Sequence, residues 1–116
     1  MLTEKTILVL EDAALIAVDI ESVLGELGAA RIVTEGGGDR RAIEPERFDL
    51  AIVDVRTAIA LGEELIADLD REGVPIVFLT TDPDQEDTPD YSGRFSVVQK
   101  PFNYRDLCAA IAELAA

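Results

Sequence analysis

The sequence predicts an α/β fold in which a doubly wound parallel sheet carries helices on both faces. Short apolar, β-branched runs alternate about five times with longer segments, several of which have apolar residues at helical spacing. Most of these runs lack the polar alternation of a half-exposed strand, which is typical of strands buried on both faces. The 116 residues suffice for one domain with a single core, and no internal repeat or linker divides them.

The five apolar runs define the expected strands. They are Thr6–Leu10, Ala30–Thr34, Leu50–Asp54, Val74–Thr80 and Phe95–Gln99. Between them we expect a helix over Ala13–Leu27 and a weak short helix over Asp39–Glu44. A loop from Arg56 to Gly62 runs into a third helix, which is expected from about Ala58 to Glu72. A last helix follows Asn103.

The first and last expected helices have identifiable ends and inward faces. Asp12 is a candidate N-cap for the first helix, and Gly28 a C-terminal stop. Asn103 with Asp106 three residues later is typical of a helix start. The residues expected to face the core are Leu15, Ile16, Ile20, Val23, Leu24 and Leu27 in the first helix, and Leu107, Cys108, Ile111 and Leu114 in the last.

Two segments depart from the alternation. Asp82–Gly93 contains two prolines, five acidic residues and no apolar periodicity, so the fourth helix is expected to be short, irregular or disordered. The glycines at 36–38 lack the spacing and the lysine of a phosphate-binding loop, which favours a flexible turn.

Composition excludes several classes of function. A formal net charge of −14 argues against nucleic-acid binding through a basic face and against attachment to anionic membranes. The chain has no histidine, which excludes Ser-His and Cys-His catalysis and histidine metal ligation. Its single cysteine suits a reducing cytoplasm, and no segment approaches the length of a membrane span.

Polar residues at the ends of four expected strands carry the candidate chemistry. Parallel topology would bring together, at one edge of the sheet, Glu11 and Asp12, Asp54, Thr80, and Lys100. Three crowded carboxylates with only oxygen ligands available favour Mg²⁺. A carboxylate beside a metal, a lysine and a hydroxyl predicts a site that receives a phosphoryl group, with the carboxylate as nucleophile.

These residues in this order resemble the receiver domain of response regulators in two-component signalling. The resemblance spans nearly the whole chain and rests on Glu11-Asp12, Asp54, Gly62, Thr80 and Lys100-Pro101-Phe102. It implies a flavodoxin-like fold with strand order 2-1-3-4-5, and one receiver domain over residues 1–116 without an output domain. The N-terminal residues look most like small, single-domain alphaproteobacterial regulators.

The resemblance also implies a role for each matching residue. Asp54 would accept the phosphoryl group from a histidine kinase or a histidine phosphotransfer protein. Asp12, Asp54 and the backbone carbonyl of Arg56 would ligate Mg²⁺, with Glu11 acting mostly through water. Thr80 and Lys100 would bind the phosphoryl oxygens, and the Lys100–Pro101 peptide would be cis.

The expected output residues differ from the family's pattern. The aromatic residue usual three positions before the lysine is Val97 here, and Phe95 on the same face could substitute only partly. The proline usual four positions after the acceptor is Ala58. These departures put the usual relay from Thr80 to an aromatic side chain in doubt. The expected switch and output residues are Val97, Phe95 and Pro101.

Three functional hypotheses follow. The first is a phosphorylatable cytoplasmic switch, a monomer or weak homodimer, which acts through a downstream protein target. The second is a pseudo-receiver, an interaction module that works without phosphorylation. The third, a small phosphohydrolase, needs a second acid two residues after the nucleophile, and that position is Arg56; we therefore do not expect an enzyme with turnover.

Overall fold

The structure is a computed structural model that describes residues 1–35, 48–61, 63–81 and 89–115. Four expectations fall wholly or mostly outside these ranges: the turn at 36–38, the short helix over Asp39–Glu44, Gly62, and the connection over Asp82–Gly93 up to residue 88.

The five described strands form one parallel sheet, as predicted. They are β1 (Thr6–Leu10), β2 (Arg31–Glu35), β3 (Leu50–Asp54), β4 (Ile76–Thr80) and β5 (Phe95–Gln99). Their order is β2-β1-β3-β4-β5, and every neighbouring pair is parallel. The apolar runs of β1, β3 and β4 lie in the middle of the sheet and are buried on both faces, which is why these strands lack polar alternation.

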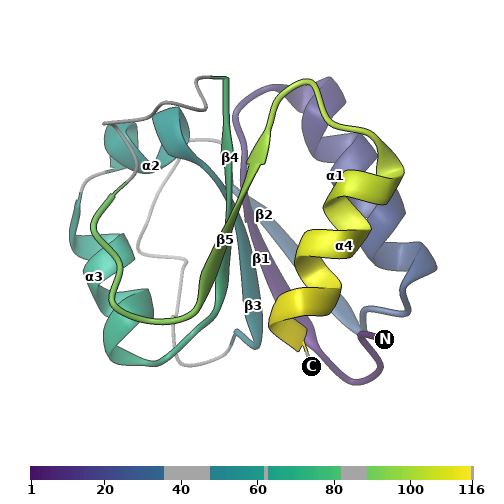
Figure 1. Ribbon diagram of the computed structural model, residues 1–116, viewed down its shortest axis with the longest axis horizontal. Coiled ribbons are helices and arrows are strands. Elements are labelled where there is room, and N and C mark those ends of the chain that lie inside the picture. Colours follow the sequence, from purple (N-terminus) through teal and green to yellow (C-terminus); the bar gives the residue numbers. More distant parts are fainter. Residues whose placement is uncertain (36–47, 62, 82–88, 116) are drawn as a thin grey trace.

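Helices cover both faces of this sheet (Figure 1). The helices α1 (Ala14–Glu26) and α4 (Tyr104–Ala115) pack on one face, and α2 (Val55–Leu61) with α3 (Glu63–Arg71) on the other. Each pair buries its own apolar cluster against the strands. The described part of the chain contains no helix that is long and apolar enough to cross a membrane.

Helix α1 matches its expected extent but not all of its expected contacts. Ile20 and Leu24 are fully buried, whereas Leu15 is 84% exposed, so its expected place in the core is wrong. The N-cap residue is Ala13, without a side-chain capping bond, so the cap expected at Asp12 is wrong too. Gly28 ends the helix as expected, with a positive φ of 89° that favours glycine.

Helix α2 is the main correction to the expected fold. The expected loop from Arg56, with a helix only from about Ala58, is wrong at its start: the chain is helical from Val55 to Leu61, and this helix begins directly after β3. Val55, Thr57 and Ala58 are buried against the sheet, so this segment has an inward face that its short length conceals in the sequence. No proline interrupts it, since position 58 is alanine.

The C-terminal elements agree closely with expectation. Asn103 and Asp106 exchange backbone-to-side-chain hydrogen bonds of 3.3 and 2.8 Å, which form the predicted start of α4. The Lys100–Pro101 peptide is cis, as the resemblance implied. Leu107 and Ile111 are fully buried, and Cys108 is half-buried beside them.

The segment that leads into β5 is held by one aromatic side chain. Residues 89–94 contain no helix or strand, in agreement with the irregular connection that the prolines predict. The ring of Tyr91 contacts Phe78 and Phe95 edge to face, and its hydroxyl donates a hydrogen bond to the carbonyl of Val74. The carboxylate of Asp70 accepts bonds from the next two backbone N–H groups, those of Ser92 and Gly93.

Removing the Tyr91 hydroxyl should destabilise the fold in a pH-dependent way. Tyr91→Phe keeps the ring but removes a hydrogen bond, so we expect a loss of about 1 kcal/mol in the free energy of unfolding at neutral pH. Burial, and then the charge of Asp70, raise the pKa of Tyr91 from 10 to about 12. The native state therefore retains this proton more strongly than the unfolded chain does, and wild type loses stability as pH rises from 10 to 12.

Urea unfolding of both proteins between pH 8 and pH 12 tests this, since the titrations of other groups are common to both. The difference in the free energy of unfolding between wild type and Tyr91→Phe should become smaller above pH 10. A gap that stays constant or widens would contradict the assignment of the proton to Tyr91.

Candidate functional site

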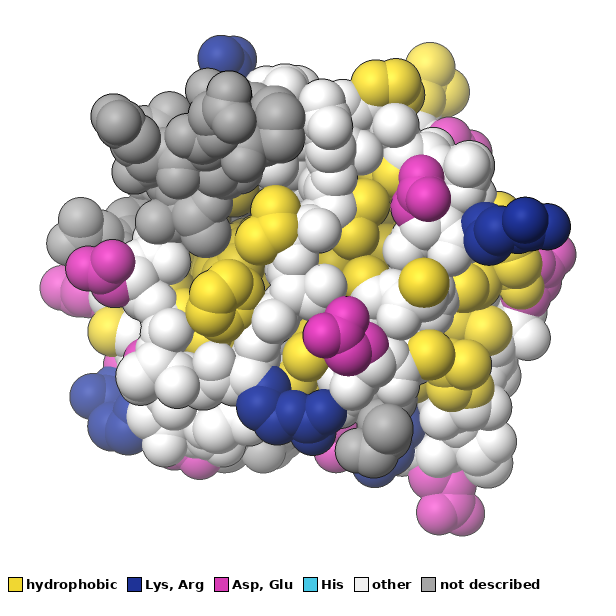
Figure 2. Space-filling model, viewed as in Figure 1, with side chains coloured by type: hydrophobic (Ala, Val, Ile, Leu, Met, Phe, Trp, Pro, Cys, Tyr) yellow, Lys and Arg dark blue, Asp and Glu magenta, His cyan; other side chains and the backbone are white. Residues whose placement is uncertain are grey.

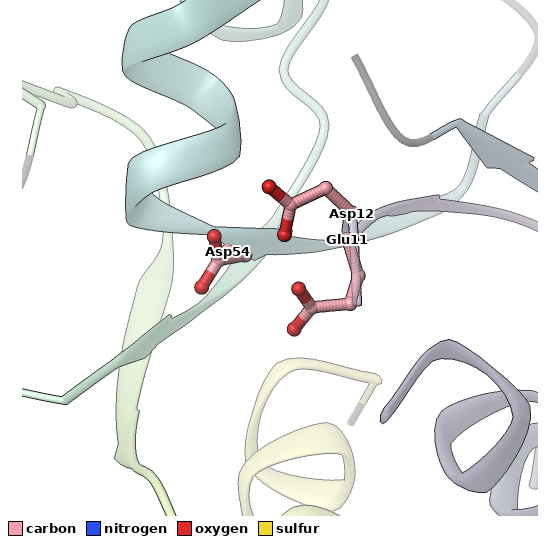
Figure 3. Close-up of side chains that lie close together, drawn as sticks. All are labelled: Glu11, Asp12 and Asp54. Carbon is pink, nitrogen blue, oxygen red and sulfur yellow. The ribbon is translucent and has the colours of Figure 1, made fainter. Parts of the chain in front are cut away.

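Three carboxylates meet at the carboxyl end of the sheet (Figure 3). Glu11 and Asp12 follow β1, and Asp54 is the last residue of β3, which pairs with β1 in parallel. One carboxylate oxygen from each of the three lies within 4.8 Å of the others. The parallel pairing that the strand pattern predicts thus brings these side chains together.

Lys100 links two of these carboxylates. Its backbone N–H donates to the carbonyl of Thr80 at 2.7 Å, which places the lysine at the same edge of the sheet. Its ammonium group lies 2.5 Å from Oε1 of Glu11 and 2.8 Å from Oδ1 of Asp54. Glu11 is 2% exposed and Asp54 6%, so a single cation offsets the charge of two buried carboxylates.

Asp54 is also the N-cap of α2. Its Oδ2 accepts a hydrogen bond from the backbone N–H of Thr57 at 2.9 Å and another from the Thr57 hydroxyl at 2.9 Å. Thr57 is the third residue of the helix, which is where a capping carboxylate binds. We did not predict Thr57 as a site residue, although an aspartate three positions before it is a recognisable capping signal.

These contacts set the ionisation of the site. Burial alone would raise the pKa of Asp54, but hydrogen bonds from Lys100 and Thr57 outweigh it and hold its pKa below the ordinary 3.8. Burial would lower the pKa of Lys100, yet the bonds to Asp54 and Glu11 raise it above the ordinary 10.5. Both groups are therefore charged at neutral pH, and the stabilisation by Asp54 is lost as pH falls below its ordinary pKa.

A cavity of about 320 Å³ opens beside Asp54. Asp12, Arg56, Thr80 and Lys100 line it, so the structure brings every predicted acceptor and metal-ligand residue to one place. Asp12 is exposed, and Thr80 is buried at the end of β4. Arg56 is the second residue of α2, and a carbonyl there points along the helix axis toward residue 60.

The expected output residues lie apart from this cavity. Val97 and Pro101 line a groove between β5 and α4. Val97 is 43% exposed and Phe95 45%, and Phe95 also packs edge to face on Phe78. Figure 2 shows hydrophobic side chains in the middle of the face that it draws, between the two helical layers of Figure 1. In the described residues, the aromatic contacts of Phe95 run to Phe78 and Tyr91 rather than to Thr80.

Two substitutions at Asp54 should separate its capping role from its charge. Asp54→Asn and Asp54→Ala both remove the same negative charge and relieve the same repulsion, but only asparagine keeps an oxygen for the Thr57 N–H. We expect the alanine variant to be less stable than the asparagine variant by about 1 kcal/mol in urea unfolding. Equal stability of the two variants would show that the cap contributes nothing.

Comparisons with known proteins place this site in a family. No family model matches the chain. The transcriptional regulatory protein PdtaR of Mycobacterium tuberculosis is 33% identical over 117 positions, which cover 96% of this chain and 56% of PdtaR. The chain thus spans about half the length of the curated relatives it matches.

Solved protein structures are also similar to this chain. SdrG from Pseudomonas melonis, in its BeF₃-activated conformation, is 30% identical with a TM-score of 0.67 over the full length of both chains. A CheY-like response regulator receiver domain protein from Methanospirillum hungatei is 25% identical with a TM-score of 0.73, covering 97% of this chain and 95% of that one. With the fold and the cluster at its carboxyl edge, these similarities show that the chain belongs to the response-regulator receiver domains of two-component signalling.

Proposed function

We propose that Asp54 accepts a phosphoryl group from a phosphohistidine on a partner kinase or phosphotransfer protein. The observation that carries this proposal is the position of the Asp54 carboxylate, which is ionised, borders an open cavity, and lies 2.8 Å from the Lys100 ammonium. A positively charged donor beside a nucleophilic carboxylate offsets the charge that accumulates as a phosphoryl group arrives. The determination of SdrG in a BeF₃-activated conformation supports the same reading.

The carboxylate cluster fits a Mg²⁺ ion. Its three carboxylate oxygens lie within 4.8 Å of one another, and oxygen is the ligand that Mg²⁺ prefers. Asp12 and Asp54 would bind it directly, and Glu11 through water. The backbone carbonyl of Arg56, the other expected ligand, points along α2 toward residue 60 and would reach the ion only if the first turn of the helix opened. When bound, the ion would supply charge neutralisation at the transferring oxygens.

The remaining residues act on the phosphoryl group itself. Lys100 is held by Glu11 and Asp54, and its flexible chain lets the ammonium follow the phosphoryl oxygens once they arrive. The Thr80 hydroxyl, at the end of β4 in the same cavity, would donate a hydrogen bond to one of those oxygens. The phosphoryl group then carries two negative charges at a place where Asp54 carried one, and this change is the signal.

The chain would act as a cytoplasmic switch whose effect passes through a downstream protein rather than through nucleic acid or a membrane. We propose that residues 1–116 form one receiver domain, monomeric or weakly dimeric. The excess of 24 acidic over 10 basic residues is consistent with protein partners. PdtaR is named a transcriptional regulatory protein, and this chain matches 56% of its length.

One observation favours the alternative of a pseudo-receiver, a module that binds its partner without phosphorylation. Position 97 holds an exposed valine, and the nearby Phe95 is engaged with Phe78 and Tyr91, so a rotating aromatic side chain is missing from β5. Under this alternative, Asp54 would serve the cap of α2 alone.

Exposure to acetyl phosphate with Mg²⁺ distinguishes the two functions. We expect wild type to gain one phosphoryl group by intact-protein mass spectrometry, because Asp54 is a charged nucleophile beside Lys100. Asp54→Asn and wild type with EDTA should both remain unmodified. If wild type is also unmodified, and beryllofluoride causes no NMR shifts near Asp54, the pseudo-receiver is the correct function.

Replacing Lys100 should have opposite effects on metal binding and on phosphorylation. Lys100→Met removes a cation from the carboxylate cluster, so we expect Mg²⁺ to bind several-fold more tightly by titration calorimetry. The same change removes a donor to the phosphoryl oxygens, so the rate of phosphorylation should fall on the order of 100-fold.

The chain's other lysine supplies the matched control. Lys5 is exposed and lies ahead of β1, at the opposite end of the strand from Glu11, and Lys5→Met should leave both quantities unchanged. Loss of Mg²⁺ binding in Lys100→Met, with the fold intact by circular dichroism, would contradict the proposed roles.

A further inference from the structure

The peptide that joins Arg56 to Thr57 faces Asp54 with its N–H group. That N–H donates to Oδ2 of Asp54 at 2.9 Å, and the Thr57 hydroxyl donates to the same oxygen at 2.9 Å. This peptide is trans and planar, so its C=O points away from the side that its N–H faces. The carbonyl of Arg56 therefore points away from the carboxylate and along α2.

Both oxygens of Asp54 already have donors. Oδ2 accepts two hydrogen bonds, which fill the acceptor positions that one carboxylate oxygen offers. Oδ1 accepts a bond from the Lys100 ammonium at 2.8 Å, and a metal ion beside this oxygen would be repelled by that cation. Thr57 is neutral, so its departure from Oδ2 leaves no cation unpaired. Oδ2 is therefore the oxygen at which an ion can more readily replace the donors.

Opening the first turn of α2 would exchange a donor for an acceptor at the same place. As the Arg56–Thr57 peptide turns, its N–H leaves Oδ2 and its C=O can swing toward the carboxylates, where an ion would need an oxygen ligand. The helical bond that this costs is the one from the Ala60 N–H to the Arg56 carbonyl. Ala60 is exposed, so water can replace the lost acceptor.

We propose that Thr57 and Mg²⁺ compete for Oδ2 of Asp54, so that binding of the ion uncaps α2 and opens its first turn. This inference rests on the Mg²⁺ site of the proposed function. The capped helix belongs to the metal-free protein, and a helix that begins later belongs to the metal-loaded protein. The strength of the Thr57 cap thus limits the affinity of the site for the ion.

Backbone NMR of the wild-type protein tests the opening directly. The ¹³Cα chemical shifts of residues 55–57 report whether this turn is helical. They should have helical values in EDTA and lose them in saturating MgCl₂, and the Ala60 amide should then exchange faster with solvent. The shifts of α1, which packs on the other face of the sheet, should stay helical under both conditions.

Substitutions at position 57 test the competition. Thr57→Val keeps the branched shape and the charge of the site but removes one of the two bonds that the ion must displace. We expect Mg²⁺ to bind about tenfold more tightly to this variant by titration calorimetry, as for the loss of one hydrogen bond to a charged group. Thr57→Ala removes the same hydroxyl, should show the same gain, and serves if the valine variant does not fold.

A second threonine supplies the matched control. The hydroxyl of Thr34 also donates to a carboxylate, that of Glu21, but this bond joins β2 to α1 and Thr34 does not line the cavity. Thr34→Val should leave the affinity for Mg²⁺ unchanged. If the Thr57 bonds instead oriented Asp54 for the ion, Thr57→Val and Thr57→Ala would both bind Mg²⁺ more weakly than wild type.

Each outcome decides the proposal. Loss of helical shifts at residues 55–57 with Mg²⁺, together with tighter binding in the Thr57 variants alone, supports it. A first turn that stays helical in saturating Mg²⁺ overturns it, as does equal or weaker binding in the Thr57 variants or an equal gain in Thr34→Val. These results would leave the metal site of the proposed function standing. No binding of Mg²⁺ to wild type overturns that site, and this inference with it.

Discussion

The ion pairs of one lysine hold the carboxyl edge of this sheet together. Glu11 and Asp54 end adjacent strands, are almost fully buried, and would repel each other without a cation between them. Lys100 supplies that cation from the far edge of the sheet, where its backbone bond to Thr80 continues the pairing of β4 with β5. The geometry of three strand ends thus depends on one ammonium group, in a chain with a net charge of −14.

Asp54 joins this cluster to the helical layer. Its Oδ1 belongs to the ion pair with Lys100, and its Oδ2 caps α2 through Thr57. A chemical change at Asp54 therefore acts directly on a helix, without an intermediate side chain. This direct coupling offers an output route that does not need an aromatic side chain on β5. Such a side chain is not available there, because β5 carries Val97 where the family usually has an aromatic residue, and Phe95 is held by Phe78 and Tyr91. In the described residues, α2 is the helix in direct hydrogen-bonded contact with the acceptor.

The errors in the expected fold concern features that tertiary packing decides. The central strands were predictable because Ile7–Leu10 and Leu50–Val53 are uninterrupted apolar runs, which is typical of strands buried on both faces. The start of α2 was placed about three residues too late, at Ala58 rather than Val55, because its first turn is too short for a periodic signal. That turn is stabilised by burial of Thr57 and Ala58 and by the cap. Leu15 fits a helical stripe but lies on the exposed side of α1, because packing against the sheet decides the rotation of the helix.

The sequence by itself determined the parallel sheet and the residues at its carboxyl edge. Strand-end positions follow from the hydrophobic pattern, and parallel strands must end at the same side, so Glu11, Asp12, Asp54, Thr80 and Lys100 could be grouped without coordinates. Only the tertiary structure decided which donor each carboxylate oxygen accepts. Hydrogen bonds depend on distances of a few tenths of an ångström and on the path of α2, so the double contact of Thr57 with Oδ2 becomes visible only when the helix is in place.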